Sequence, residues 1–341
     1  MTTPPPTIWV IVLHWQDLAD TAACLEALRA QTGVVCQVGL VDNDPGEPAR
    51  ALAGPGVHYL AAGRNLGYAE GNNLGLRYAL DHGAAYLLVL NNDTVAPPEM
   101  CGRLLEAVEA DERIGLVCPT IASWAQPALR FTPSIDWACG QAGETWMPAN
   151  DAATRPVDYA SGCALLARAA AVRAVGLFDA AYFAYYEDVD WSLRFQEAGY
   201  RTLIVPETCV YHKGTPDQRP AKSPGAWYYF TRNQMRFIRR YTPRRRRLSL
   251  LRAFTQSALA NFTQVRAAQQ LVNADAILDG WWAGLRGQSG PERPPAPGWV
   301  KALLAARPEW WLWLSASRLE WRGRARVRTR LRRLWPRGSK V

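Results

Sequence analysis

The sequence predicts an α/β protein, with an open, mostly parallel sheet flanked by helices and a helical extension after it. Over about the first 120 residues, short apolar runs rich in β-branched residues alternate with segments of helical periodicity. Runs of this kind are typical of strands that are buried on both faces of a sheet. After about residue 222 the pattern is helical throughout, so the strands are expected to end there.

The expected strands and helices alternate along the N-terminal part of the chain. Strands are expected at 7–15, 36–44, 56–62, 85–94 and 114–121, and helices within 20–32, 71–83 and 97–115. Asp20 is the expected N-cap of the first helix, and Gly83 the expected end of the second. Pro97 and Pro98 are expected to begin the third helix. In such a sheet, ligands bind at the carboxyl ends of the strands.

The remaining segments predict the domain organisation. Residues 124–157 are rich in Pro, Ala and Trp and are expected to be irregular, whereas 161–179 predict a strand and a helix. Residues 202–212 predict a pair of strands, and 287–298 a Pro/Gly linker. We expect an α/β domain at 1–222, a helical region packed on it at 223–290, and a linker, Trp-rich helix and basic tail at 291–341.

The net charge of +9 belongs to the end of the chain. Residues 322–341 hold nine Lys and Arg and no acid, and the rest of the chain balances 30 basic with 30 acidic residues. Eight of the fifteen Trp lie in 281–341. Trp and Leu beside Arg are typical of an interfacial helix on anionic lipid, so an anionic membrane surface is the expected partner. The alternatives are a packed helical subdomain for the Trp residues, and a protein partner or homodimer contact for the tail.

Other features of composition exclude several classes of protein. A neutral body without a nucleic-acid fold argues against nucleic-acid binding. Seven scattered cysteines without a CxxC pair predict reduced thiols. The sequence shows no export signal and no run of about 18 apolar residues, the length that spans a bilayer. A cytoplasmic protein at the inner face of the cell membrane is expected.

Polar residues follow the strand at 85–94, where Asn91, Asn92 and Asp93 stand together. Alternate residues at a strand end point to the same side, so Asn91 and Asp93 could jointly face a metal-bound diphosphate. Oxygen ligands suit Mg²⁺ or Mn²⁺. A turn is the alternative, since Asn and Asp are common in turns. His212 ends another strand, and it is either a structural histidine or a ligand that its strand brings beside Asp93.

The segment 63–75 is rich in Gly and Asn and precedes a helix. It either presents backbone N–H groups to a phosphate or forms a structural loop that caps the helix. It lacks the GxGxxG spacing and the Walker lysine, which argues against a dinucleotide site or a P-loop.

Three carboxylates, Glu187, Asp188 and Asp190, lie among aromatic residues in YFAYYEDVDWSLRF. A carboxylate kept in a semi-apolar site has a raised proton affinity, which suits a general base. The alternative is an acidic first turn of a helix. A solvated loop needs no such rings and a packed core does not favour the charges, so the segment predicts a partner, either a cation or a proton.

These motifs occur in one order: VIVLHW, VDND, RNLGYAEGNN, LNNDT, SGCALLARAAAVRAVGLFDAAYFAYYEDVDW, VYHKG and WYYFTRNQMRFIRRY. In that order they closely resemble the inverting family 2 glycosyltransferases with a GT-A fold, in particular the rhamnosyltransferase-like branch. The resemblance implies a Rossmann-like sheet. The resemblance covers about residues 7–245. One departure concerns the DxD motif, whose first residue is Asn91 here, so one negative charge at the metal is lost.

The resemblance implies a role for each matching residue. Asp188 would be the catalytic base, and Asp93 and His212 would hold Mg²⁺ or Mn²⁺. The substrate-binding positions would be Asp42 at the nucleotide base, Arg64 and Asn65 in the nucleotide pocket, Asn91 and Asn92 near the diphosphate, and Glu187, Asp190 and Trp191 toward the acceptor.

The implied reaction is a direct displacement with inversion. The donor would be a nucleoside diphosphate sugar, with dTDP-rhamnose as the leading candidate, and the acceptor a hydroxyl of a glycan or lipid-linked sugar in cell-surface polysaccharide synthesis. A sugar nucleotidyltransferase would need a basic Gly-rich signature near the first strand, and LHWQDLAD has none. A non-catalytic relative would be expected to lose Asp188 or Asp93, and both are present.

Overall fold

The computed structural model describes residues 5–147, 153–214 and 223–306. Its centre is one mixed sheet with the strand order β3-β2-β1-β4-β10-β6-β11-β5. These strands are β1 Thr7–His14, β2 Val35–Asp42, β3 Val57–Ala61, β4 Tyr86–Asn91, β5 Thr94–Val95, β6 Ile114–Ser123, β10 Ala164–Arg168 and β11 Arg201–His212. β3, β2, β1 and β4 are parallel, and β10 is antiparallel to both β4 and β6. The predicted α/β fold with a mostly parallel sheet is confirmed.

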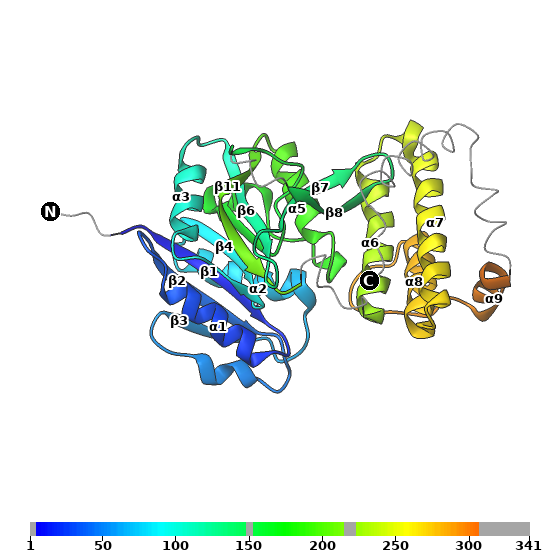
Figure 1. Ribbon diagram of the computed structural model, residues 1–341, viewed down its shortest axis with the longest axis horizontal. Coiled ribbons are helices and arrows are strands. Elements are labelled where there is room, and N and C mark those ends of the chain that lie inside the picture. The colour runs from blue at the N-terminus through cyan, green and yellow to red at the C-terminus, as the bar shows by residue number, and fades with distance from the viewer. Residues whose placement is uncertain (1–4, 148–152, 215–222, 307–341) are drawn as a thin grey trace, which may run out of the picture.

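Helices cover both faces of this sheet (Figure 1). The helices are α1 Leu18–Arg29, α2 Gly67–Asp81, α3 Met100–Glu109, α4 Ala169–Val175 and α5 Glu187–Glu197, with short 3-10 helices η1 Pro48–Leu52 and η2 Ala180–Tyr182. Along β1, Val10 and Val12 share a core with α1 and α3, while Ile11 faces the core that includes α2, α4 and α5. Alternate residues of a strand point to opposite faces, which explains why β1 is apolar throughout.

Three helix starts differ from the prediction. The N-cap of α1 is Asp17, whose side chain accepts a hydrogen bond from Asp20 N at 2.9 Å, so Asp20 lies inside the helix. α2 begins at Gly67, four residues before the expected start, and α3 begins at Met100, two residues after Pro98. A Cβ at position 75 of α2 would lie 2.4 Å from Ile11 Cγ2, so the glycine at this position lets α2 approach β1 closely.

The prediction that residues 124–157 are irregular is wrong. This segment contains β7 Arg130–Asp136, β8 Gln141–Met147 and the two-residue strand β9 Arg155–Pro156. β7 and β8 form an antiparallel hairpin with an alternating burial pattern in β7, where Phe131 and Ile135 point inward. One face of the hairpin stays polar, so it has no continuous apolar run. Residues 202–212 belong to one strand rather than two, with a register shift between Val205 and Cys209.

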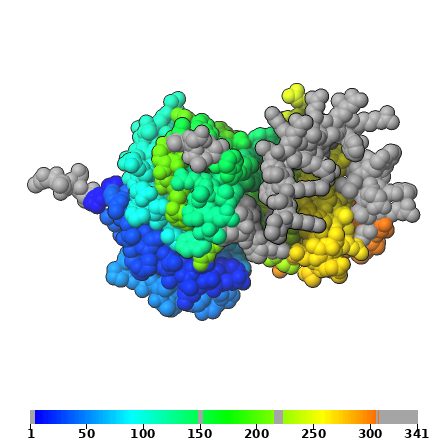
Figure 2. All heavy atoms as spheres, viewed as in Figure 1, coloured from blue at the N-terminus to red at the C-terminus, as the bar shows by residue number. Residues whose placement is uncertain are grey.

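The C-terminal helices pack against one another beside the sheet (Figures 1 and 2). They are α6 Pro224–Tyr241, α7 Arg244–Ala267, α8 Leu271–Leu285 and α9 Gly298–Ala306. Their core includes Phe254 and Ile277, and it continues to Tyr186 and Val189 at the start of α5 and to Ile135 of β7. The helical extension is therefore joined to the sheet through the hairpin and α5.

The segment expected to be a linker lies against α6. The hydroxyls of Tyr228 and Tyr229 donate to the carbonyls of Glu292 and Pro291 at 3.2 and 2.5 Å. Trp281 packs against the helical core, whereas Trp299 is 66% exposed. The predicted basic tail at 322–341 lies outside the described residues. In the part of the chain that the structure describes, no helix is both long enough and apolar enough to cross a membrane.

Candidate active site at the strand ends

The ends of β4 and β11 bring three polar side chains together. Asn91 ends β4, and His212 ends β11, where it pairs with Thr94 of β5. Asp93 Oδ1 lies 3.2 Å from His212 Nε2, and Asn91 Nδ2 lies 3.5 Å from the same nitrogen. β11 therefore carries His212 back beside Asp93, which is the arrangement that the ligand interpretation of His212 requires.

The electrostatics of this pair keep the carboxylate charged. Burial favours the neutral form of Asp93, but the hydrogen bond and charge of His212 outweigh it and hold the pKa of Asp93 below its usual value. Burial also opposes a charged His212, but neighbouring Cys163 and Asp93 reverse this effect and raise the pKa of His212. Both shifts favour the charged forms, so Asp93 and His212 attract each other as an ion pair.

The donor set fits a hard divalent cation. Asp93 offers a carboxylate that is 33% exposed, His212 offers an imidazole, and Asn91 Oδ1 is buried without a hydrogen-bond partner among the described residues. Mg²⁺ typically takes one or two carboxylates and completes its coordination with substrate phosphates and water. No three His, Cys, Asp or Glu side chains within the described ranges converge as a ready-made metal site. A cation at this site would therefore need further oxygen ligands from the phosphates of a bound substrate.

The start of α5 holds the second group of carboxylates. Asp188 Oδ2 accepts a hydrogen bond from Gly162 N at 2.8 Å, and its Oδ1 accepts from Val189 N at 2.8 Å. Burial raises the pKa of Asp188 to about 6, and the Glu144 carboxylate adds to the effect, although the backbone N–H groups oppose it. A carboxylate with this proton affinity is suited to accept a proton near neutral pH.

Glu187, next to Asp188, is the more deeply buried of the two carboxylates. It is 5% exposed, and its Oε2 is buried without a hydrogen-bond partner in the described part of the chain. Burial, and then the charge of Asp188, raise the pKa of Glu187 well above its usual value. Both carboxylates therefore hold a proton more tightly than they would in water.

Residues 162 and 163 connect the two groups. Gly162 N donates to Asp188, and the carbonyl of the next residue, Cys163, accepts from Asn91 N at 2.9 Å. The Tyr68 hydroxyl donates to the Gly162 carbonyl at 2.5 Å, and a Cβ at position 162 would lie 2.9 Å from that hydroxyl. Because of this short connection, the ends of β4 and β11 lie beside the start of α5.

The segment before Asp188 has an unusual backbone that α6 supports. Phe183, Tyr185 and Tyr186 have φ values of 64°, 70° and 75°, in the left-handed region that non-glycine residues rarely adopt. The two N–H groups of Asn233 Nδ2 are shared among three carbonyls of this segment, those of Tyr182 at 2.9 Å, Ala184 at 2.8 Å and Tyr185 at 2.7 Å. Backbone strain of this kind persists only where surrounding contacts hold it.

Arg232 adds to this support by donating to the carbonyls of Ala181 at 3.3 Å and Tyr182 at 2.7 Å. Sequence reasoning gave no role to Arg232 or Asn233. The sequence shows four consecutive polar residues within a helical segment, Thr231, Arg232, Asn233 and Gln234, and the structure adds that all four are buried.

Asp190 and Trp191, predicted on the acceptor side, are fully buried. Asp190 accepts from Arg194 Nε at 2.8 Å and the Tyr241 hydroxyl at 2.9 Å, and it pairs with Arg240 at 3.0 Å. Trp191 Nε1 donates to the Gly176 carbonyl at 2.7 Å. In this structure both side chains anchor α5 through protein contacts, and neither presents an atom to a ligand.

The predicted nucleotide side lies at the ends of β2 and β3. Asp42 is fully buried, and its carboxylate accepts from Ala49 N at 2.8 Å, Asp44 N at 3.2 Å and the Tyr59 hydroxyl at 3.2 Å. Asp42 thus organises the loop after β2. Both of its carboxylate oxygens already accept hydrogen bonds from the protein, and a nucleotide base would have to share them. Arg64, by contrast, is exposed.

Two N–H groups at the start of α2 already form hydrogen bonds within the protein. Asn43 Oδ1 accepts from Leu66 N at 2.8 Å, and Asn65 Oδ1 accepts from Gly67 N at 2.8 Å. The structure therefore favours the capping-loop alternative for 63–75 over a phosphate cradle. Asn92 Nδ2 donates to Thr21 Oγ1 at 3.0 Å, which ties the turn after β4 to α1.

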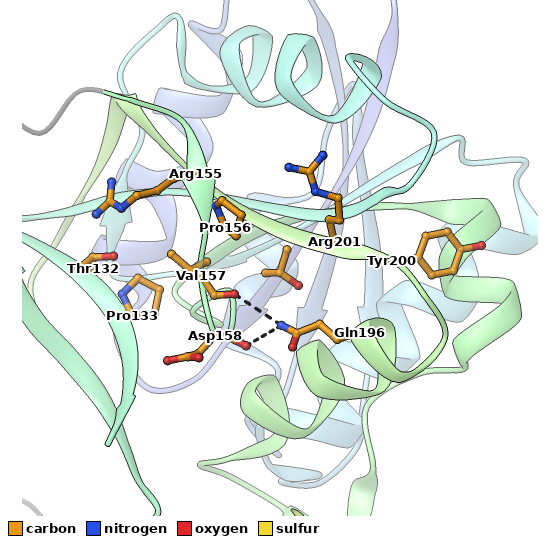
Figure 3. A pocket seen from close by; sticks show the side chains of 10 residues that line it. Thr132, Pro133, Arg155, Pro156, Val157, Asp158, Gln196, Tyr200 and Arg201 are labelled. Atoms are coloured by element: carbon orange, nitrogen blue, oxygen red, sulfur yellow. Dashed lines mark hydrogen bonds between the residues drawn. The ribbon is translucent and has the colours of Figure 1, made fainter. Parts of the chain in front are cut away.

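A cavity of about 520 Å³ lies elsewhere in the fold (Figure 3). Arg155 and Pro156 of β9 line it together with Arg201 at the start of β11, and Gln196 Nε2 donates to the Asp158 carbonyl at 2.8 Å in its wall. His212 stands at the other end of β11. This cavity is therefore separate from the candidate active site.

The sheet topology, with polar strand ends connected to the α5 carboxylates through residues 162 and 163, is that of the GT-A fold. Two solved structures share this fold. The structure of GalNAc-T7 with UDP, GalNAc and Mn²⁺ matches with a TM-score of 0.52 and 15% identity, over 69% of this chain and 48% of that one. The structure of S. aureus TarS matches with a TM-score of 0.50 and 14% identity, over 87% of this chain and 50% of that one. This chain thus matches about half of each solved chain.

The chain belongs to glycosyl transferase family 2, whose sequence profile matches residues 9–170. An N-acetylglucosaminyl-diphospho-decaprenol L-rhamnosyltransferase of Mycobacterium tuberculosis is 33% identical over 55% of this chain and 70% of its own length. A low-salt glycan biosynthesis hexosyltransferase, Agl10, of Haloferax volcanii is 24% identical over 66% of this chain and 73% of its own length. The dTDP-rhamnosyl transferase RfbF of Shigella flexneri is 23% identical over 68% of this chain and 79% of its own length. The resemblance found in the sequence is confirmed.

Proposed function

We propose that the chain is an inverting, metal-dependent hexosyltransferase that moves a sugar from a nucleoside diphosphate to a hydroxyl of a glycan or lipid-linked acceptor in cell-surface polysaccharide synthesis. One observation carries this proposal: the Asp93–His212 pair and the Asp188 carboxylate are connected through Gly162 and Cys163. A group that holds a diphosphate and a group that accepts a proton must lie on either side of one anomeric carbon for a direct displacement.

Each residue has a separate task in this mechanism. Asp93, His212 and the amide oxygen of Asn91 would hold Mg²⁺ or Mn²⁺, which neutralises charge on the departing diphosphate when bound. Asp188 would accept the proton of the attacking hydroxyl at one of its carboxylate oxygens, and its raised pKa matches this task. Glu187, whose pKa is raised well above its usual value by burial and by the charge of Asp188, would lie beside Asp188 on the acceptor side.

The names of the relatives support the identity of the donor and acceptor. A rhamnosyltransferase that acts on a diphospho-decaprenol sugar and a dTDP-rhamnosyl transferase both align with more than half of this chain. We therefore propose dTDP-rhamnose as the donor, with Arg64 and Asn65 near the nucleotide, and a lipid-linked diphosphate sugar as the acceptor.

A thermal-shift panel tests the donor. dTDP-, UDP- and GDP-sugars would be added with and without Mn²⁺ or Mg²⁺, and a bound ligand stabilises the fold by RT ln(1 + [L]/Kd). We expect dTDP-rhamnose to give the largest shift, and only with the divalent ion present. A larger shift with UDP- or GDP-sugars would replace the donor, and equal shifts with EDTA would reject the metal site.

We also propose that the C-terminal basic tail holds the protein at the inner face of the cell membrane. Residues 322–341 carry nine positive charges and no acid, and about 1 kcal/mol per basic residue near an anionic surface is sufficient for attachment. Deleting 322–341 should release the protein from anionic vesicles in a flotation assay and leave transfer to a soluble acceptor nearly unchanged. Full-length protein that does not float with anionic vesicles at low salt would overturn this proposal.

A further inference from the structure

Four arginines of α6 line a cavity of about 300 Å³ between α6 and the end of α8. The lining residues are Arg232, Arg236, Arg239 and Arg240, with Gly284, Gly287 and Gln288 opposite them. Residues spaced by three or four positions share one face of a helix, so the four guanidinium groups converge on one side of α6. The volume is at the lower end of about 300–1,000 Å³, the range of small-molecule sites.

The helices approach closely at this cavity because α8 has glycines where it crosses α6. A Cβ at position 280 would lie 2.4 Å from the Tyr228 carbonyl oxygen, and one at position 284 would lie 3.1 Å from Met235 Cβ. The close crossing places the last carbonyls of α8 within reach of Arg239, which donates to Leu285 O at 2.9 Å. The cavity is thus bounded by backbone that cannot move apart without loss of packing.

Two of the arginines are paired with carboxylates. Arg236 contacts Asp179 at 2.9 Å, and Arg240 contacts Asp190 at 3.0 Å. Asp190 is also shared with Arg194, at 2.8 Å. These carboxylates therefore supply no surplus negative charge.

The other two arginines donate to neutral groups. Arg239 donates to the carbonyls of Gly284 and Leu285, and Arg232 to those of Gly290 and Tyr182. Within the described residues, neither forms an ion pair with a carboxylate, so the wall of the cavity keeps an excess of positive charge. Burial lowers the pKa of Arg232, and the nearby Tyr228 and Tyr229 only partly oppose this effect.

The wall also contains polar atoms without partners. Arg236 Nε is buried and has no hydrogen-bond partner among the described residues, and neither has Gln288 Oε1, whose amide can rotate to present its N–H groups. Guanidinium groups bind phosphate oxygens with two parallel hydrogen bonds and keep their charge at all physiological pH values. A phosphate has enough acceptor oxygens for several such groups at once.

We propose that this cavity, which we call the arginine pocket, binds a phosphate or diphosphate group at a site distinct from the Asp93–His212 pair. The proposal does not depend on the identity of the transferred sugar. The ligand chemistry is the same for a phospholipid headgroup and for a soluble phosphate or diphosphate. Because Arg232 also holds the Ala181 and Tyr182 carbonyls, a bound anion would adjoin the support of the segment before Asp188.

Calorimetric titration of the full chain with inorganic pyrophosphate tests the proposal. The titration is done in EDTA, so that no metal-dependent donor site contributes. We expect wild-type binding, and a loss of affinity of at least tenfold in the double variant Arg236→Gln, Arg239→Gln. The matched control is Arg245→Gln, Arg252→Gln, which removes two exposed charges of α7 and should stay within twofold of wild type.

Two results would overturn the arginine pocket: no binding of pyrophosphate or phosphate by the wild type, or an equal loss in the pocket variant and its control. If the double variant does not fold, Arg236→Lys keeps a cation beside Asp179 but removes the guanidinium fork, and it should still weaken binding. Unchanged affinity in this folded variant would count against the proposal.

A second arm identifies the source of the phosphate. Vesicles containing phosphatidylglycerol are compared with pure phosphatidylcholine vesicles in flotation. Flotation with phosphatidylglycerol that falls in the pocket variant but not in its control assigns a lipid headgroup. Unchanged flotation together with lost pyrophosphate binding assigns a soluble phosphate compound, and both results support an anion site.

Discussion

Asp93 and Asp188 lie in the same candidate site, but their surroundings shift their pKa values in opposite directions. Asp93 faces an imidazole 3.2 Å away, and its pKa is held below the usual value. Among the described residues, the Asp188 carboxylate accepts hydrogen bonds only from backbone N–H groups; it lies near other carboxylates, and burial raises its pKa to about 6. Two carboxylates with pKa values pushed apart are the usual basis for a division of chemical tasks.

The difference arises from where each residue stands in the fold. Asp93 follows a central strand, and a second strand ends beside it and supplies a cationic partner. Asp188 stands in the first turn of α5 beside another carboxylate, Glu187. The first environment favours permanent charge, as a cation ligand requires. The second keeps the charged form only weakly favoured, as proton transfer requires.

The same substitution at both positions gives the sharpest test of this difference, and the largest effect is expected at Asp188. Asp188→Asn keeps the shape of the side chain but cannot accept a proton. Turnover should fall by about 10²–10⁴, the usual contribution of a general base. Donor affinity, measured by thermal shift, should barely change.

The pH profile provides the control for this variant. The rate of the wild type should rise with pH through about 6, because Asp188 must lose its proton before it can act. The residual rate of Asp188→Asn should lack this rise. Retention of more than about a tenth of wild-type turnover would reject Asp188 as the base, and Glu187 would then be substituted.

Asp93→Asn should show the opposite division of effects. The variant loses the charge that attracts a cation, so the metal-dependent part of donor binding should weaken by at least about tenfold, since even outer-shell partners of a metal are worth 10–100-fold. The concentration of Mn²⁺ needed for half-maximal activity should rise, and the acid limb of the pH profile should persist. Activity that is unaffected both by this substitution and by EDTA would show that the two carboxylates do not divide the tasks in this way.

The sequence predicted the strand half of the site better than the helix half. Asn91, Asp93 and His212 end apolar strands, and strand ends of one sheet meet at one edge, so their proximity follows from local patterns. The support of Asp188 depends on Asn233, about 50 positions away, on a helix whose packing face the sequence does not reveal. The hairpin β7–β8 was missed for a related reason, because one of its faces is polar and its other face packs on residues far along the chain.

Asn233 therefore offers a test of how far the helix half depends on its support. Asn233→Ala removes the amide whose two N–H groups are shared among three carbonyls of the segment 182–185. An unsatisfied buried group costs about 1–3 kcal/mol, so we expect a loss of this order in stability and a fall in turnover of about tenfold. Urea unfolding and steady-state kinetics measure the two effects.

The neighbouring amide is the matched control for Asn233. Gln234 is also buried, but its Nε2 makes one longer bond, 3.4 Å, to the Cys139 carbonyl and does not touch the segment before Asp188. Gln234→Ala should lower stability without a matching loss of turnover per folded molecule. Equal effects of the two variants on turnover would mean that Asn233 contributes only to general packing.

The smallest expected effect is a gain of stability in Asp188→Asn that depends on pH. The pKa of Asp188 rises from about 3.8 in the unfolded chain to about 6 in the folded one, so the folded state binds the proton more tightly. Below about pH 4 both states are protonated and the residue costs nothing, whereas above about pH 6 the folded state must hold an unfavourable charge. A shift of about two units corresponds to at most about 3 kcal/mol, and partial exposure of Asp188 reduces this value.

The Asp188→Asn variant gives up one accepted N–H bond, worth about 0.5–1.5 kcal/mol, and it should still be the more stable protein at pH 8 by roughly 1 kcal/mol. Urea unfolding of both proteins at pH 4 and pH 8, without divalent ions, measures the difference. A stability difference that is the same at both pH values would show that the fold imposes no cost on the charge of Asp188, and the contrast with Asp93 would then lose its physical basis.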